Sequence, residues 1–232
     1  MIRRLMGALA VAATLAGCAA QGATQTDQQS LVDRSTLTLQ EMFTQNRNPQ
    51  AVSLLQKAKA VMVCPRVFKA GFILGGAGGG CVLVGRSATG ATGPAAWSGP
   101  AFYSLGTGSL GLQAGVQDSE VVLVVLTDKG LRSLLDSQFK FGAGAGVAVA
   151  TYGAGVQGSM TPAMTADIVS FSADRGLFAG ISLDGSVLSS RSAWDQSYYG
   201  QALSPQQIVL NMQGNNQGDM PLKAMLAHIV GQ

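Results

Sequence analysis

The glycine-rich stretch KAGFILGGAGGGCVLVGR, residues 69–86, is the first candidate for chemistry, because glycine-rich loops can bind phosphates through backbone N–H groups. A dinucleotide-binding loop needs the spacing G-x-G-x-x-G between a strand and a helix, and this stretch does not contain it. The spacing occurs in GTGSLG (106–111) and GAGVQG (153–158), but strand-like sequence follows both. We therefore predict no nucleotide site. We assign the glycines of residues 69–86 to a tight strand connection that needs positive φ or close backbone approach.

Catalytic and metal-binding side chains are scarce. The only histidine is His228, near the C-terminal end, and a serine–histidine–aspartate arrangement would depend on it. Metal sites need clustered histidines, cysteines or carboxylates, which this composition does not supply. The weak net charge of +3 argues against nucleic-acid binding. We expect no enzyme activity, no metal, no cofactor and no nucleic-acid partner.

Cys18 is the clearest modification site in the sequence. Arg3 and Arg4 form a basic start, and the apolar run at residues 5–16 is too short to span a bilayer but suits a signal-peptide core. The segment LAGC that ends at Cys18 resembles the bacterial lipobox, in which the cysteine is lipidated and becomes the first mature residue. We predict a signal peptide at residues 1–17 and a covalent lipid, such as palmitate, on Cys18.

The surroundings of this cysteine predict where the protein lies. Residue 19 is alanine rather than aspartate, which favours the outer membrane over retention at the inner one. Residues 18–29 are polar and small, which suits a flexible tether, and residues 30–232 suit one domain. We expect a lipid-anchored outer-membrane protein that faces the periplasm, with surface exposure as an alternative.

The two remaining cysteines could form a disulfide. Cys64 and Cys81 lie seventeen positions apart, and the periplasm is an oxidising compartment. They form either a bridge or two buried free thiols, and the sequence leaves both open.

Basic residues are concentrated in the half of the chain next to the predicted anchor. Residues 18–90 hold seven basic and three acidic side chains, whereas residues 91–232 hold six basic and nine acidic ones. A basic residue close to an anionic membrane adds attraction of about 1 kcal/mol. The asymmetry predicts a headgroup site that includes Arg66 and Arg86, or else it reflects scattered surface charge.

Helical periodicity precedes the strands. Residues 31–46 place apolar side chains roughly on one helical face, and Pro49 suits the first turn of a second helix that continues through residue 62. In the second helix, Lys57 and Lys59 would flank the apolar stripe on opposite sides. This arrangement suits a helix in the membrane interface, and it equally suits a helix packed on the protein's own core.

Short β-type runs broken by glycine follow from residue 61, and VVLVVLT (121–127) has the character of a buried strand. Turns are predicted at Asp174-Arg175-Gly176 and at Asp184-Gly185. The later helices are expected at 128–137 with Thr127 as cap, at 205–210 with Ser204 as cap, and at 219–230. The fold class predicted is α+β: a single domain with a dominant antiparallel sheet or barrel of many short strands, and with N-terminal and C-terminal helices.

Several ordered motifs resemble the SYLF domain family. The run AKAVMVCPRVFKAGFILGGAGGGCVLVGR is similar to the start of that domain, and the resemblance covers about residues 50–210. The later motifs, in the family's order, are Trp97-Ser98-Gly99-Pro100-Ala101, the glycine and glutamine pattern from Gly106 to Gly115, RGLFAGISLDGS (175–186) and Tyr199-Gly200. The chain departs from the family at Cys64 and Cys81, where apolar, aromatic or small residues are usual. This departure supports a local bridge.

The resemblance implies a non-catalytic phospholipid-binding module, whose eukaryotic members bind phosphoinositides and in some cases actin. It implies lipid contact by a helix at residues 50–62 with Lys57 and Lys59, and by Lys69. Because phosphoinositides are uncommon in bacterial envelopes, an anionic phospholipid or lipopolysaccharide is the expected ligand. The alternative is a structural lipoprotein that binds another envelope protein and contacts lipid only through Cys18.

Overall fold

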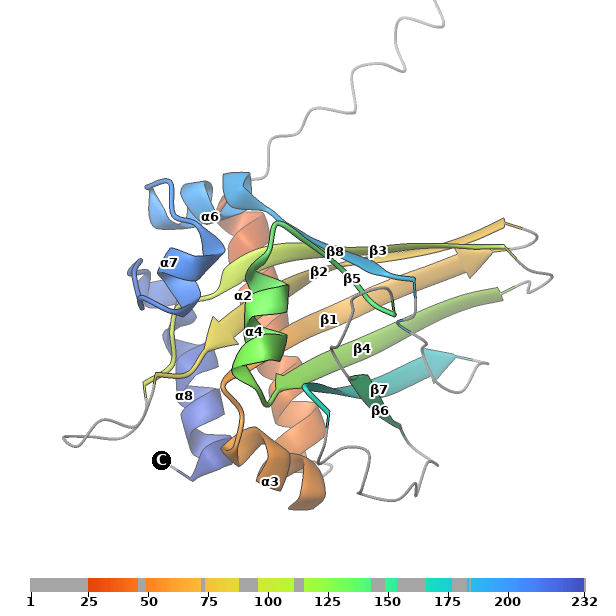
Figure 1. Cartoon of the computed structure of the whole chain (residues 1–232), viewed down its shortest axis with the longest axis horizontal. Coiled ribbons are helices and arrows are strands. Elements are labelled where there is room, and N and C mark those ends of the chain that lie inside the picture. Colours follow the sequence, from red (N-terminus) through yellow and green to blue (C-terminus); the bar gives the residue numbers. More distant parts are fainter. Residues whose placement is uncertain are drawn as a thin grey trace, which may run out of the picture.

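The strands that the structure describes assemble into one curled, eight-stranded sheet with the order β5-β8-β3-β2-β1-β4-β7-β6 (Figure 1). Neighbouring strands run antiparallel, except that β6 and β7 run parallel. The strands are β1 (Ala60–Gly71), β2 (Leu74–Gly85), β3 (Ala101–Leu110), β4 (Gly115–Val125), β5 (Gln138–Lys140), β6 (Val149–Gly153), β7 (Ile168–Gly176) and β8 (Val187–Ser190). The computed structural model describes residues 25–45, 49–71, 74–87, 96–110, 115–142, 149–153, 166–176, 183 and 185–231.

Helices at both ends of the sequence pack on this sheet, which confirms the predicted α+β domain. The helices are α2 (Gln25–Leu39), its π-helical continuation η2 (Gln40–Gln45), α3 (Pro49–Gln56), α4 (Asp128–Leu135), α6 (Ser192–Tyr199), α7 (Pro205–Val209), the 3-10 turn η3 (Gln217–Asp219) and α8 (Met220–Val230). The central strands β1 to β4 are 10 to 12 residues long, so they are longer than the short strands expected. The predicted signal peptide and Cys18 lie outside the described residues.

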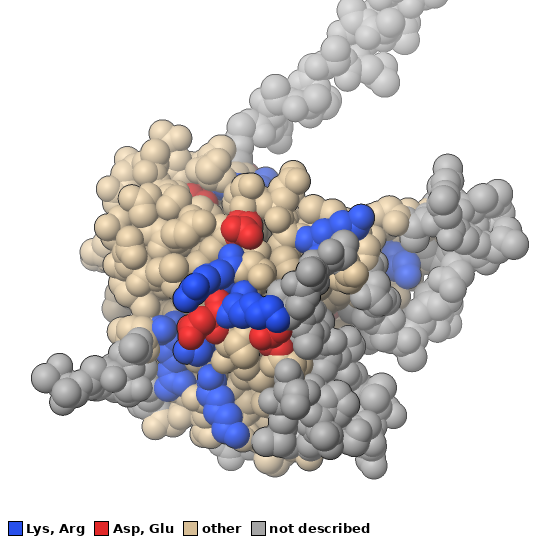
Figure 2. Space-filling model, in the orientation of Figure 1, with Lys and Arg blue, Asp and Glu red and all other residues tan. Residues whose placement is uncertain are grey.

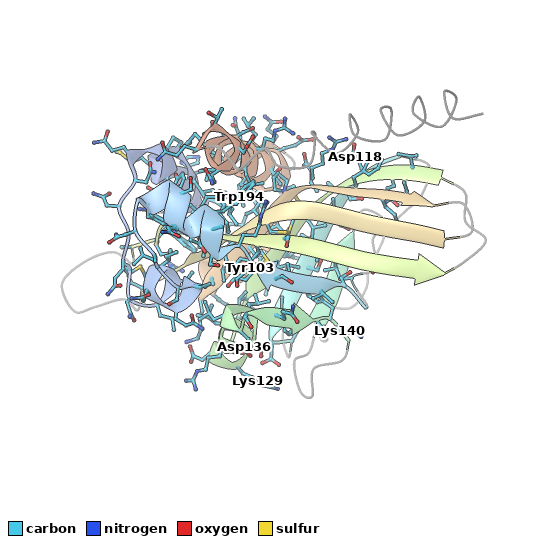
Figure 3. The ribbon with its side chains drawn as sticks, turned by 90° about the horizontal axis from the view of Figure 1, so that it is seen from above. Tyr103, Asp118, Lys129, Asp136, Lys140 and Trp194 are labelled. Atoms are coloured by element: carbon cyan, nitrogen blue, oxygen red, sulfur yellow. A yellow bond between two sulfur atoms is a disulfide. The ribbon has the colours of Figure 1, made fainter. Side chains whose placement is uncertain are left out.

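Alternating side chains give the central strands two buried faces. Met62 and Leu123 point to the face on which α4 and α7 pack. They belong to one apolar cluster with the buried leucines of α4 and the buried Ile208 and Val209 of α7. Val61 and Val63 point to the opposite face, which α2, α3 and α8 cover with a second cluster. Seen from above, α2 and α4 lie on opposite sides of the sheet (Figure 3). Burial on both faces explains why Val121–Val125 in β4 is a continuous apolar run, as the sequence predicted for this strand.

Two predicted helix caps are confirmed. The hydroxyl of Thr127 accepts a hydrogen bond from the N–H of Gly130 and begins α4. Ser204 and Gln207 form a reciprocal capping box at the start of α7. The last predicted helix is also present, as α8 preceded by one 3-10 turn.

The boundaries of the first two helices differ from the prediction. Helix α2 begins at Gln25, so residues 25–29, which we expected in the flexible tether, form its first turns. Helix α3 ends at Gln56 rather than at residue 62. The chain leaves the helix there because residues 60–63 pair with both β2 and β4, and this pairing overrides the helical spacing of the apolar residues. Lys57 and Lys59 therefore do not flank a helical stripe.

The turn expected at Asp174-Arg175-Gly176 is also wrong. These residues continue β7 and pair with residues 117–119 of β4. The local turn composition is overridden by nine consecutive pairings between the two strands. The second expected turn is supported at Gly185, which has a φ of 77°.

The glycines of residues 75–80 lie within strand β2 rather than in a tight connection. Positive φ occurs at other described glycines, such as Gly142 and Gly185, and at none of residues 75–80. Close backbone approach is the part of the prediction that is confirmed. A Cβ atom on Gly79 would overlap the carbonyl oxygen of Arg66 on the neighbouring strand. Only glycine fits there because β1 bulges between Cys64 and Val67 and brings its backbone onto β2.

Cys64 and Cys81 form a disulfide between the adjacent strands β1 and β2. Both side chains are buried in the cluster on the α4 side of the sheet. The structure thus favours the bridge over the two free thiols that the sequence left open.

Candidate functional site

The five predicted headgroup residues are spread along the central hairpin, with Lys57, Lys59 and Arg86 at one end, Arg66 at the bulge in the middle of β1, and Lys69 toward the other end. Lys59 immediately precedes β1 and Arg86 immediately follows β2, and the N–H of Arg86 donates to the carbonyl oxygen of Lys59 at 2.8 Å. Lys69 lies ten residues further along β1. Because a strand rises about 3.3 Å per residue, the two ends are roughly 30 Å apart. The structure therefore does not bring these residues into one site.

The end that carries Lys59 and Arg86 is already engaged with the protein itself. Lys59 Nζ lies 3.0 Å from a carboxylate oxygen of Asp128. The guanidinium of Arg86 donates to the backbone carbonyl of Gln56 and lies over the ring of Trp97. Figure 2 shows acidic side chains among the basic ones on the face that carries α4. This mixture of charge weakens the attraction of that face for an anion.

A groove runs along α2 on the other side of the sheet. It consists of two cavities that share Arg34, Pro65 and Arg66 as lining residues. The larger cavity has a volume of about 670 Å³ and also contains Arg191 from the start of α6. The smaller cavity, of about 320 Å³, also contains acidic side chains. We call these two cavities together the α2 groove.

Helix α2 contributes one side of the groove through its own periodicity. Asp27, Leu31, Arg34 and Thr38 on α2, followed by Glu41 on η2, line the two cavities and recur every three or four residues. Residues at this spacing share one face of a helix. Residues further along α2 therefore lie further along the groove.

The β1 bulge contributes the opposite side. It carries Pro65, which has no N–H to lose from the ladder, followed by Arg66. Arg66 donates two hydrogen bonds to the carboxylate of Asp118 on β4, from Nε to Oδ1 at 2.8 Å and from Nη2 to Oδ2 at 2.9 Å. This pairing raises the pKa of Arg66, so its charge is fixed at any ordinary pH. Asp118 lies on the α2 side of the sheet (Figure 3).

Arg191 closes the N-terminal end of the groove. Its guanidinium lies 3.3 Å from the ring centroid of Trp194, which is a cation–π contact. Burial lowers the pKa of Arg191, and the carboxylate of Asp27 opposes this effect. Figure 3 places Trp194 beside α2, at the end of the sheet where the helices lie.

Charge is distributed unevenly along the groove. The larger cavity is lined by three arginines and one acidic residue, Asp27. The smaller cavity is lined by two of the same arginines and by Glu41, Asp118 and Glu120. An anion is therefore favoured in the larger cavity and disfavoured in the smaller one.

Sequence reasoning identified Arg66 but missed Arg34 and Arg191. The spacing of Arg34 from Asp27 and Leu31 signals a shared helical face, but only the packing of α2 shows that this face borders a groove. Arg191 carries no local signal of the groove, because every other residue of the cavity except Trp194 lies more than a hundred positions away in the sequence. Lys69 is near the bulge in sequence but does not line either cavity.

Two other described side chains are candidates for chemistry. His228 is exposed in the last turn of α8. Asp195 is fully buried and accepts a hydrogen bond from the N–H of Phe102 at 2.9 Å, and burial raises its pKa to about 7. Within the described ranges, no group of three histidine, cysteine or carboxylate side chains is placed to hold a metal ion. None of the helices in the part of the chain that the structure describes is long and apolar enough to cross a membrane.

Comparison with known proteins identifies one family. The Ysc84 model, described as Las17-binding protein actin regulator, matches residues 106–229, which is more than half of the chain. SH3 domain-containing YSC84-like protein 1 from Homo sapiens is 27% identical over 172 residues, which cover 74% of this chain and 46% of the human protein. The rat protein of the same name is 28% identical over 172 residues, which cover 74% of this chain and 47% of the rat protein.

A yeast protein is similar over a comparable length. Protein YSC84 from Saccharomyces cerevisiae is 24% identical over 159 residues, which cover 67% of this chain and 33% of the yeast protein. The matched region thus spans less than half the length of these relatives.

Proposed function

Because the chain belongs to the Ysc84 family of SYLF domains, we propose that it is a non-catalytic module that binds anionic phospholipid at a membrane surface. The observation that carries the proposal is the gathering of Arg34, Arg66 and Arg191 from three separate elements into one groove. Guanidinium groups suit phosphate because their planar N–H donors match two oxygens at once.

The predicted lipid anchor fits this location. Cys18 precedes the first residue of α2, Gln25, by seven positions, and a fully extended chain of that length spans at most about 25 Å. Asp27, two residues into α2, already lines the larger cavity. A lipid on Cys18 would therefore hold the cavity close to the membrane surface. We propose the periplasmic side of a bacterial outer membrane as that surface.

Vesicle binding tests the proposal. The mature chain with Cys18→Ser, which has no acyl anchor, is sedimented with vesicles of phosphatidylglycerol and phosphatidylcholine, and with vesicles of phosphatidylcholine alone. We expect binding to the anionic vesicles that weakens as salt rises, because exposed charges are screened. Equal binding to both vesicle types, or no binding to either, would contradict the proposal.

A protein-binding lipoprotein is the second candidate function. The description of the family names Las17 binding and actin regulation, which are interactions with proteins. In this chain, large apolar side chains are exposed near the groove, with Leu37 at 62% and Phe68 at 41% of their surface. Under this alternative the Cys18→Ser chain would not bind anionic vesicles, and crosslinking in the envelope would trap one protein partner with these two side chains at the contact.

A further inference from the structure

We infer that the larger cavity of the α2 groove is a receptor for one anionic phospholipid, with its phosphate between Arg34 and Arg191 and its apolar part along Phe68. The inference rests on the proposed function and goes further, because a membrane can attract a basic surface without any lipid entering a defined site. It commits to one lipid per chain and to named contacts.

The position of the phosphate follows from which arginines are available. Arg66 is held by both oxygens of Asp118, so its donors are partly used. Arg34 is exposed on α2 and makes no ion pair or hydrogen bond with the described residues. Arg191 rests on the face of Trp194, and a phosphate can bind the guanidinium without breaking this contact. Arg34 and Arg191 are therefore less engaged than Arg66, although the carboxylate of Asp27 offsets part of the charge of Arg191.

The acidic end of the groove gives the ligand its direction. Glu41, Asp118 and Glu120 line the smaller cavity and repel a phosphate from it. The lipid phosphate therefore lies toward the N-terminal end of α2. This is also the end that follows Cys18 in the sequence.

Apart from Asp27 and Ser30, the remaining lining of the larger cavity is apolar or bare backbone. Phe68 is 41% exposed at the cavity, and Leu31 packs over Gly80, where an added Cβ would lie 3.1 Å from its side chain. At Gly78 the nearest atom to an added Cβ is a backbone oxygen at 3.5 Å, so the sheet surface there carries no covering side chain. An inorganic phosphate would leave this surface exposed to water, whereas the glycerol and upper acyl chain of a phospholipid would cover it.

The two tryptophans of the chain make the site directly observable. Trp194 lines the larger cavity, whereas Trp97 is buried elsewhere, under Arg86. We would titrate the Cys18→Ser chain with dihexanoyl phosphatidylglycerol below its micelle concentration and follow the two indole N–H signals by NMR. We expect a saturable shift of the Trp194 signal at one lipid per chain, and no shift of the Trp97 signal. Dihexanoyl phosphatidylcholine and inorganic phosphate are the comparison ligands, and each should bind at least tenfold more weakly.

Matched variants test the arginines. Arg34→Gln with Arg191→Gln removes two charges from the cavity, and Arg132→Gln with Lys140→Gln removes two exposed charges, one on α4 and one on β5, away from α2. Because hydrogen bonds to charged groups are among the stronger ones, we expect the first pair to weaken lipid binding tenfold or more. The second pair should leave it within twofold. Arg34→Gln alone, on an exposed helix surface, carries the same test if the double variant does not fold.

The outcomes separate this inference from the proposed function. If anionic vesicles still bind but the Trp194 signal does not move, or both variant pairs weaken binding equally, the cavity is not the receptor and only surface attraction remains. If inorganic phosphate binds as tightly as the lipid, the assignment of the apolar part is wrong. If vesicles do not bind either, the proposed function itself fails.

Discussion

Arg66 and Asp118 form a bidentate ion pair between strands β1 and β4, with Nε–Oδ1 at 2.8 Å and Nη2–Oδ2 at 2.9 Å. The pair lies where the two cavities of the α2 groove meet. Both side chains are substantially exposed, so the pair adds little to the free energy of folding. Its main effect is electrostatic, because Asp118 offsets one of the three arginine charges that an anionic ligand would meet.

Replacing Asp118 by asparagine should therefore strengthen binding to anionic vesicles. The change removes one negative charge beside the cavity and leaves Arg66 free to contact a phosphate. We expect a several-fold rise in the vesicle partition coefficient at low salt, and a change of under about 1 kcal/mol in the free energy of unfolding. Sedimentation and urea unfolding measure the two quantities.

The control for this change is Asp128→Asn, which removes the partner of Lys59 at the other end of the hairpin. It alters the net charge equally but lies far from the groove. If both variants raised vesicle binding to the same extent, total charge rather than the groove would govern binding.

Gly79→Ala should destabilise the fold strongly. A Cβ at this position would overlap the backbone carbonyl oxygen of Arg66, which cannot move without breaking the β1 bulge. We expect a loss of about 2 kcal/mol or more in the free energy of unfolding, measured with urea. The matched control is Gly106→Ala on β3, where an added Cβ meets no atom within 4 Å. Equal losses at both positions would show that strand glycines matter here for some other reason.

Much of the fold could be predicted from the sequence because its signals are local. Thr127 and Ser204 begin their helices as their side chains predict, since a cap needs only the next three residues. The end of α3 could not be predicted in this way. The helical spacing of apolar residues continues to residue 62, and only pairing with β2 and β4 converts residues 60–63 into a strand.

The site was less predictable than the fold. Charge counting located an excess of basic residues in the first half of the chain, but it could not tell paired side chains from free ones. Lys59 is paired with Asp128, and Arg86 contacts Gln56 and Trp97. Part of the excess positive charge is therefore engaged in contacts within the protein. The groove depends on Arg191, which only the tertiary fold brings to α2.

The separation of the basic residues leads to a third prediction. Lys57→Gln with Lys59→Gln should weaken binding to anionic vesicles by no more than about twofold, because these residues act on the membrane only as distant charges. Arg34→Gln with Arg191→Gln, which removes the same charge, should weaken it at least fivefold. Vesicle sedimentation at one salt concentration compares them. A larger effect from the lysine pair would instead support lipid contact through residues 50–62, which the family resemblance implied.

The bridge between Cys64 and Cys81 should contribute measurably to stability. It links strands at positions seventeen residues apart, and closing a loop of this size contributes about 3 kcal/mol in the unfolded-chain model. We expect reduction with a phosphine to lower the melting temperature by several degrees. Mass analysis after alkylation in concentrated urea without reductant, which exposes both positions, should find neither residue labelled. Labelling of both residues in protein isolated from an oxidising compartment would show that the bridge does not form.

Asp195 should make stability depend on pH between about 4 and 7. Burial raises its pKa to about 7 in the folded chain, against an ordinary value near 3.8. The folded state therefore holds its proton more tightly, and the free energy of unfolding falls as pH rises through this window. Asp195→Asn keeps the oxygen that accepts the N–H of Phe102 but cannot ionise, so the variant should lack this part of the fall.

Urea unfolding at several pH values between 4 and 8 measures this difference. The stability of Asp195→Asn relative to the original chain should rise steadily up to pH 7 and then level off. Asp219, whose pKa is also raised by burial, contributes equally to both proteins and cancels in the comparison. The exposed Asp136→Asn is the control and should show no such trend. A constant difference across the whole range for Asp195→Asn would mean that this carboxyl group is already ionised in the folded chain at pH 4.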